Sequence, residues 1–155
     1  MIEVRNLSKT FGESTEVLKD ISFRINKNDV VAVLGPSGTG KSTMLRCLCV
    51  PTTGTIRIGD VTVDAAHHTK AEVRNLRRQS AMVFQSYNLF KNKTAKENVM
   101  EALVTVQKKP KAEAEEIALK FLKKVGMLDR QDFYPSKMSG GQQQRVGIAR
   151  ALAVN

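Results

Sequence analysis

Residues 30–42 read VVAVLGPSGTGKS, five apolar residues followed directly by a glycine-rich loop. The apolar run at 30–34 predicts a short strand that is buried on both faces, because the run is continuous and rich in β-branched residues. The loop fits the pattern G-x-x-x-x-G-K-[ST], and residues 41–50 predict a short helix that Pro51 ends. Strand, loop and helix therefore stand in the order that a phosphate-binding loop requires.

The residue types in this loop suit a phosphate ligand. Glycines allow backbone N–H groups to turn inward around phosphate oxygens, and the N-terminus of the helix adds a partial positive charge. We expect Lys41 to reach the β- and γ-phosphates, Ser42 to hold Mg²⁺ through its hydroxyl, and Thr43 to contact a phosphate farther along. The alternative is a glycine-rich turn with a solvated lysine, and the pattern does not choose between ATP and GTP. The predicted nucleotide-binding residues are Gly35, Pro36, Ser37, Gly38, Thr39, Gly40, Lys41, Ser42 and Thr43.

Other segments alternate apolar and polar residues or form short apolar runs, and these predict further strands. The predicted strands lie at residues 2–7, 21–25, 55–58, 61–63 and 81–84, with Gly59-Asp60 as the turn of a hairpin. Residues 85–93 are polar and predict a loop.

The second half of the sequence predicts helices. A helical region is expected at 94–106, and apolar residues at helical spacing predict an amphipathic helix from Lys111 that Gly126 caps. Residues 142–154 are good helix formers, and Ser139 is a plausible N-cap for them.

Length, composition and net charge limit the classes of function that the chain can have. With 155 residues, 41% of them hydrophobic and 26% charged, the sequence predicts one globular domain. No apolar run approaches the roughly 20 residues of a transmembrane helix, and no secretory signal is recognisable, so we expect a cytoplasmic chain. The formal charge of +10 favours anionic partners. A nucleic-acid-binding module is a rival on charge alone, but few aromatic residues lie between the basic ones to stack on bases.

A second motif narrows the choice of protein family. Residues 138–142 read MSGGQ, and QQR and IARAL follow at 143–145 and 148–152. This sequence resembles the signature motif of ABC ATPases, a family whose members also carry a phosphate loop. Phe11-Gly12 resembles the A-loop of that family, and Gln85 resembles the glutamine of its Q-loop. The resemblance runs from residue 2 to residue 155, and FQSYNLF at 84–90 is most similar to polar amino-acid importers.

The resemblance implies an α/β fold, namely a P-loop nucleoside triphosphatase of ABC type. It implies an N-terminal antiparallel β part, a Q-loop and helical subdomain at about residues 86–140, and an incomplete core sheet within a single domain, 1–155. The nucleotide would be ATP, with Phe11 stacked on the adenine and Gln85 near Mg²⁺. The signature residues would bind the γ-phosphate held by a second copy, paired head to tail; they are Ser139, Gly140, Gly141 and Gln142.

The same resemblance implies the partners and the location. Transmembrane permease subunits would bind the chain directly and a solute-binding protein indirectly, with no nucleic-acid partner. The chain would lie peripherally on the cytoplasmic face of the cell membrane, where ATP binding and hydrolysis energise amino-acid uptake.

The sequence also departs from the family. Family members carry an Asp that orders Mg²⁺, an adjacent catalytic Glu and a switch His after the signature helix, and the printed sequence has none of these there. We therefore expect a C-terminally truncated chain with no catalytic residue of its own and little hydrolysis alone. A catalytically inactive fragment that binds only nucleotide or a partner is the alternative. The strands at 30–34 and 81–84 would lack their usual neighbours and expose apolar faces, which is an aggregation hazard.

Overall fold

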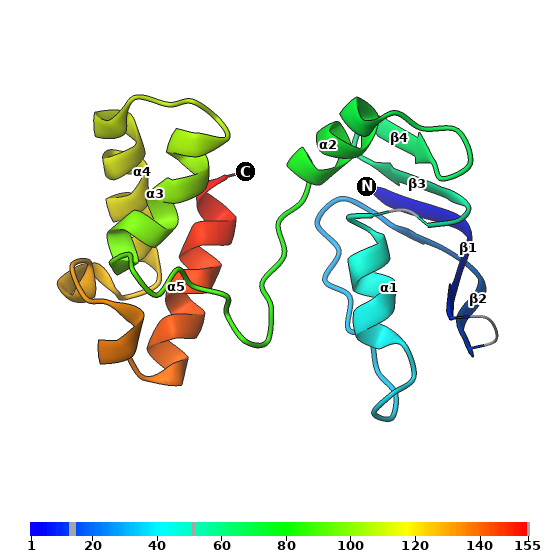
Figure 1. The fold of residues 1–155 in the computed structure, drawn as a ribbon, viewed down its shortest axis with the longest axis horizontal. Coiled ribbons are helices and arrows are strands. Elements are labelled where there is room, and N and C mark those ends of the chain that lie inside the picture. Colours follow the sequence, from blue (N-terminus) through cyan, green and yellow to red (C-terminus); the bar gives the residue numbers. More distant parts are fainter. Residues whose placement is uncertain (13–14, 51, 155) are drawn as a thin grey trace. The chain divides into compact units, whose positions relative to one another are not determined.

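The chain folds into two compact units, Met1–Ser80 and Ala81–Asn155. This computed structural model describes residues 1–12, 15–50 and 52–154 (Figure 1). Each unit has a hydrophobic core of its own, and each is described separately below. The assignment of both units to a single domain, with a helical subdomain from about residue 86 to 140, stays a prediction.

The first unit is built on a four-stranded antiparallel sheet with the order β2-β1-β3-β4. Its strands confirm those predicted at residues 2–7 and 21–25, and the predicted hairpin. The two longest exceed the prediction, because they pair over almost their whole length. The strands are β1 (Ile2–Phe11), β2 (Thr15–Ile25), β3 (Thr55–Ile58) and β4 (Val61–Asp64).

A β-bulge decides which side chains of β1 enter the core. Val4 and Leu7 are both buried, although strict alternation would place them on opposite faces of the sheet. The pairing register shifts between these two residues, and Asn6 takes a φ of 53°. The extra residue turns Leu7 back to the face of Val4, and asparagine tolerates this left-handed conformation better than most residues.

Two helices contact this sheet. Helix α1 (Lys41–Cys47) lies against β2 and confirms the helix predicted after the phosphate loop, although it ends three residues before Val50. Pro51, which was expected to end it, lies outside the described residues. Helix α2 (Lys70–Arg78) contacts β4 and was not predicted, because its sequence is mostly polar. It buries Leu76 and starts with a capping box in which Thr69 and Glu72 each bond the other's backbone N–H.

The strands predicted at residues 30–34 and 81–84 are wrong. Both segments are irregular, and neither has a hydrogen-bonded partner strand within the described part of the chain. Without a partner, a strand leaves its backbone N–H and C=O groups unpaired, so apolar composition alone does not stabilise it. The predicted exposure of apolar groups is seen in both segments: Val30 is 100% and Leu34 88% exposed in the first, and Val83 is exposed in the second.

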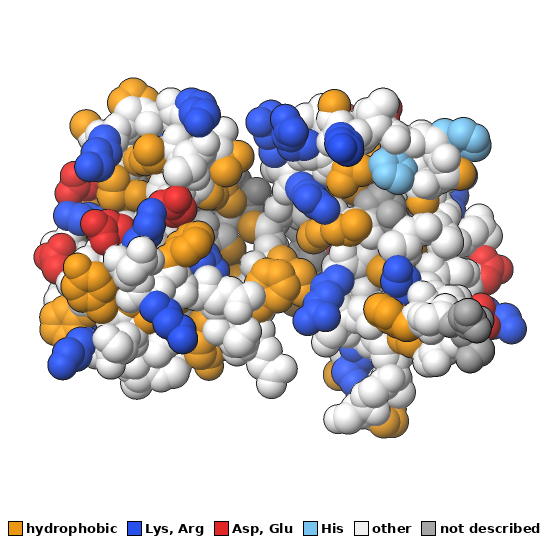
Figure 2. All heavy atoms as spheres, in the orientation of Figure 1, with side chains coloured by type: hydrophobic (Ala, Val, Ile, Leu, Met, Phe, Trp, Pro, Cys, Tyr) orange, Lys and Arg blue, Asp and Glu red, His pale blue; other side chains and the backbone are white. Residues whose placement is uncertain are grey.

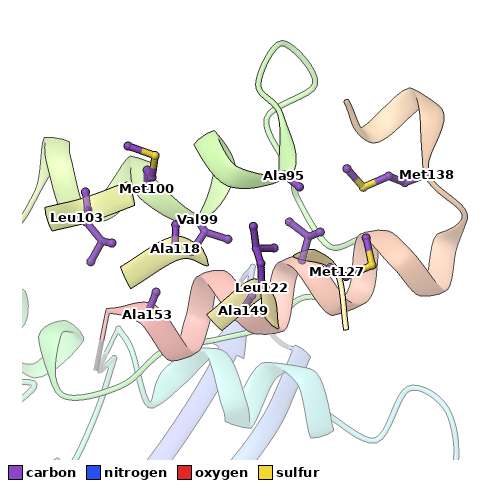
Figure 3. Packing of buried hydrophobic residues seen from close by; sticks show 12 residues of the cluster. Ala95, Val99, Met100, Leu103, Ala118, Leu122, Met127, Met138, Ala149 and Ala153 are labelled. Carbon is purple, nitrogen blue, oxygen red and sulfur yellow. The ribbon is translucent and has the colours of Figure 1, made fainter. Parts of the chain in front are cut away.

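The second unit contains three α-helices packed around one core (Figure 3). They confirm the three helices predicted in this half, and each pair of them is in contact. Gly126 has a φ of 67° just after the second helix, as a glycine in a C-terminal cap requires. The core includes Val99, Leu103, Leu122 and Val146, all 0% exposed. The helices are α3 (Ala95–Thr105), α4 (Lys111–Lys124) and α5 (Gly140–Ala153).

Two further observations concern membrane-spanning helices and the charge of the surface. No helix in the described ranges is both long enough and apolar enough to cross a membrane. Figure 2 shows Lys and Arg side chains gathered over α2, whose basic residues are Lys70, Arg74, Arg77 and Arg78.

Candidate functional site

The predicted phosphate loop leads directly into α1. Gly35, Gly38 and Gly40 have φ values of 150°, 84° and 85°, which other residues rarely adopt. At Gly40 a Cβ atom would lie 2.9 Å from Cγ1 of Val17 on β2. The third glycine is thus required both by its backbone conformation and by the close approach of the loop to the sheet.

The ammonium group of Lys41 is held inside this loop. Its Nζ donates hydrogen bonds to the carbonyl oxygens of Gly35, at 2.8 Å, and Pro36, at 2.5 Å. The Thr39 hydroxyl donates to the same Pro36 oxygen at 2.9 Å and tightens the turn. Phosphate oxygens are stronger acceptors for an ammonium than neutral carbonyls are, so the loop can exchange these contacts for a nucleotide.

The hydroxyls that follow Lys41 lie in the first turn of α1. Ser42 is exposed and Thr43 is partly buried, and the Met44 N–H closes the turn on the Gly40 oxygen at 2.8 Å. A serine hydroxyl beside an exposed phosphate loop is a suitable ligand for Mg²⁺, a hard cation that prefers oxygen. The structure therefore brings the nine predicted loop residues together in an arrangement that fits a magnesium nucleotide.

Phe11 lies in the same unit, at the end of β1. The residue is 51% exposed, and the Lys9 ammonium lies 5.2 Å from the ring centroid. An exposed aromatic ring can stack on a nucleobase, and a cation beside it can attract the phosphates of the same nucleotide.

The signature residues lie in the second unit, at the start of α5. Ser139 is the N-cap: its Oγ accepts from the Gln142 N–H at 3.3 Å, and its own N–H donates to Gln142 Oε1 at 2.9 Å. Gln142 thus has a structural role that the sequence prediction did not include. The Ser139 hydroxyl keeps its proton for donation, and a Cβ added at Gly141 would meet nothing within 4 Å. The start of α5 therefore combines a hydroxyl donor with an uncrowded helix N-terminus.

Gln85 also lies in the second unit and is exposed, in the turn that precedes Tyr87. The phosphate loop and Gln85 are thus parts of different units. The stretch that follows Gln85 is fixed by two side chains that the sequence prediction missed, Asn98 and Arg150.

Asn98 holds the end of the stretch at Phe90. It is 0% exposed, and its Oδ1 accepts from the Phe90 N–H at 2.8 Å. Its Nδ2 donates to the carbonyl oxygens of Phe90, Lys93 and Thr94 at 3.1, 3.0 and 2.9 Å. Asparagine is a weak helix former, so its place within α3 was the available signal of such a role.

Replacing Asn98 with alanine should lower the free energy of unfolding of this unit by about 2 to 3 kcal/mol, because buried backbone groups lose their partner. Urea denaturation followed by circular dichroism measures the loss. Asn92→Ala, at an exposed position of the same loop, is the control and should change little. Equal stability of the two variants would contradict a stabilising role for the Asn98 amide.

Arg150, on α5, holds the middle of the stretch. Its Nη1 donates to the Asn88 oxygen and its Nη2 to the Tyr87 oxygen, both at 2.8 Å. Burial lowers the pKa of this guanidinium, which is half-buried. No local pattern indicates this contact, because Tyr87 and Arg150 are 63 residues apart.

Comparisons with known proteins agree with this geometry. A family profile described as "ABC transporter" matches residues 18–155. The chain is 52% identical over its whole length to a probable amino-acid import ATP-binding protein of Bacillus subtilis (strain 168), and covers 63% of it. It is 51% identical to an L-cystine import ATP-binding protein of the same strain, over 99% of the chain and 64% of that protein. The chain thus spans less than two thirds of the length of these relatives.

A solved structure extends the comparison to the fold. It is a dimeric ATP-binding cassette in a post-hydrolysis state, bound to ADP and Pi, with a TM-score of 0.86 and 35% identity. The match covers 100% of this chain and 70% of the cassette. The fold class predicted from the sequence is confirmed.

Proposed function

The chain belongs to the ABC transporter family, and from this we propose that it is the ATP-binding subunit of an importer, whose ATP binding and hydrolysis energise amino-acid uptake across the cytoplasmic membrane. The phosphate loop carries the proposal, because its three glycines and the enclosed Lys41 ammonium form a cradle for a polyphosphate. The similarity to ATP-binding proteins of amino-acid import supports amino acids as the class of transported substrate. ATP is the proposed nucleotide because those relatives are ATP-binding proteins.

Each site residue then has a role. Lys41 binds the β- and γ-phosphates, Ser42 is a ligand of Mg²⁺, and Thr43 contacts the phosphate chain. Gln85 is proposed as a further Mg²⁺ ligand. Phe11 stacks on the adenine. Mg²⁺ held by these residues would neutralise negative charge on the phosphates. No residue of this chain is assigned a catalytic role in activating the attacking water.

The signature residues complete the site of a second copy. A hydroxyl and N–H groups at the start of α5 form an anion site, because a helix N-terminus carries a partial positive charge. The site consists of Ser139, Gly140, Gly141 and Gln142, and we place it on the γ-phosphate bound by the partner in a head-to-tail dimer. The related cassette is described as a dimer, which supports this arrangement. The proposed further partners are transmembrane permease subunits and, indirectly, a solute-binding protein, with the chain on the cytoplasmic face of the membrane.

A second candidate function is nucleotide binding without hydrolysis. The described residues that line the cavity of about 350 Å³ beside the phosphate loop include no carboxylate. A general base must lie within hydrogen-bond reach of the attacking water, directly or through one further water. The chain by itself would then bind ATP and leave it intact.

Two measurements test these functions. The purified chain is titrated with a fluorescent ATP analogue with and without Mg²⁺, and phosphate release from ATP is followed. Binding with sustained phosphate release supports the first function, binding without release supports the second, and no binding contradicts both. Uptake of radiolabelled cystine by membrane vesicles that contain an importer permease and this chain then tests the link to amino-acid transport.

A further inference from the structure

The turn at Tyr87-Asn88 has an unfavourable backbone conformation. Both residues have positive φ values, 58° and 47°, and a bulky side chain such as that of Tyr87 rarely adopts such a value. A conformation of this kind persists only where surrounding contacts hold it. The two hydrogen bonds from Arg150 supply such contacts, because they bind the carbonyl oxygens of these same two residues.

The side chain of Tyr87 runs along α5. A Cβ added at Gly147, in the middle of the helix, would lie 3.8 Å from the Tyr87 carbonyl oxygen and 3.9 Å from the Tyr87 Cβ. A Cβ added at Gly140, in the first turn of the helix, would lie 3.6 Å from the Tyr87 hydroxyl oxygen. Tyr87 therefore spans two turns of α5, from the level of its own backbone to a signature glycine.

The other anchor of this stretch is Asn98, which binds both backbone groups of Phe90. Between Gln85 and Phe90, the chain is thus fixed to α5 at Tyr87 and Asn88 and to α3 at Phe90. Gln85, which precedes the first anchor, is exposed.

We propose that Arg150 and Tyr87 are positioning residues that lock the backbone following Gln85 to α5, the helix that Ser139 caps, so that Gln85 and Ser139 move together. This inference rests on the proposed function for its consequence: a permease that displaces the turn would also displace the signature residues. The lock itself is a property of the second unit and can be tested without that function.

Hydrogen exchange tests the lock. In Arg150→Gln, peptides that cover residues 86–89 should exchange at least about tenfold faster, because two charge-assisted hydrogen bonds are lost. Arg150→Lys should give a smaller increase, since an ammonium cannot bind two carbonyls with the geometry of a planar guanidinium. Arg130→Gln, an arginine of the same unit whose Nε bonds to Asp129, is the control and should leave this peptide unchanged. Unchanged exchange in Arg150→Gln would overturn the proposal.

The coupling is tested in the transporter that contains this chain, assembled with its permease in vesicles. Arg150→Gln should reduce the stimulation of ATP hydrolysis by solute at least about fivefold, with basal hydrolysis within about twofold of the unmodified protein and partial rescue in Arg150→Lys. Tyr87→Phe, which keeps the ring but removes the hydroxyl beside Gly140, should retain most of the stimulation. A proportional loss of basal and stimulated rates would mean general destabilisation and would overturn the coupling. A transporter that hydrolyses no ATP even when unmodified would contradict the proposed function, and the exchange experiment would still decide on the lock.

Discussion

Lys41→Ala should weaken Mg-ATP binding by about a hundredfold or more, because charge-assisted hydrogen bonds to the phosphates contribute roughly 1.5 to 3 kcal/mol each. The same substitution removes the two hydrogen bonds that Lys41 makes to the Gly35 and Pro36 oxygens. Those carbonyls lie in an exposed loop where water can replace the lysine, so the effect should fall on binding rather than on stability. Titration with a fluorescent ATP analogue measures the dissociation constant.

The control for Lys41→Ala is Lys27→Ala, which removes one positive charge from an exposed turn of the same unit. It separates the specific phosphate contact from the general attraction of a chain with a formal charge of +10. We expect the control to change the dissociation constant less than about twofold at physiological salt, where exposed charges are screened. If both variants bind ATP as the unmodified chain does, Lys41 is a solvated lysine in a glycine-rich turn.

The elements that the sequence predicted well are those whose signals are local. The hairpin around Gly59 follows from a turn flanked by strand-like segments, and α4 follows from apolar residues at helical spacing that end before Gly126. Helix α2 shows that a local signal can be present and missed. Thr69 and Glu72 have the spacing of a capping box, but the segment that follows is too polar to suggest a buried face.

The segments predicted wrongly have no partner strand in the described part of the chain. Residues 30–34 and 81–84 have the composition of buried strands, but a strand also needs a neighbour to pair with, and composition does not reveal one. Burial patterns in β1 were equally beyond local reasoning, since a bulge at Asn6 decides that Leu7 faces the core. In each case the prediction failed because local composition does not show whether, or in which register, a segment pairs with a distant one.

The same distinction applies to the site. The phosphate loop could be predicted because its chemistry lies within nine consecutive residues, Gly35 to Thr43. Asn98 and Arg150 could not, because their roles depend on carbonyl groups of residues that no pattern relates to them. Ser139 was predicted both as a helix cap and as a ligand of the γ-phosphate, and the structure confirms the cap.

Ser139→Arg should abolish ATP-induced dimer formation and leave ATP binding by the single chain within about twofold. The arginine would place a long, charged side chain where the γ-phosphate of the partner's nucleotide is proposed to bind, and a clash at the centre of an interface prevents closure. The phosphate loop lies in the other unit, so its nucleotide contacts should persist. Analytical ultracentrifugation with ATP and without Mg²⁺, which prevents hydrolysis, measures the dimer.

Ser139→Arg also removes the N-cap of α5, which costs about 1 kcal/mol, so its effect on dimer formation needs a separate control. Ser139→Ala removes the cap without adding bulk, and Ser139→Thr keeps a hydroxyl that can still cap the helix. If closure depends on space and hydrogen bonding at this position, the dimer should persist best in the threonine variant, weaken in the alanine variant and disappear in the arginine variant. Equal loss in the alanine and arginine variants would show that loss of the Ser139 hydroxyl accounts for the whole effect and that the bulk of the arginine adds nothing. A dimer that survives the arginine would place the signature residues outside the interface.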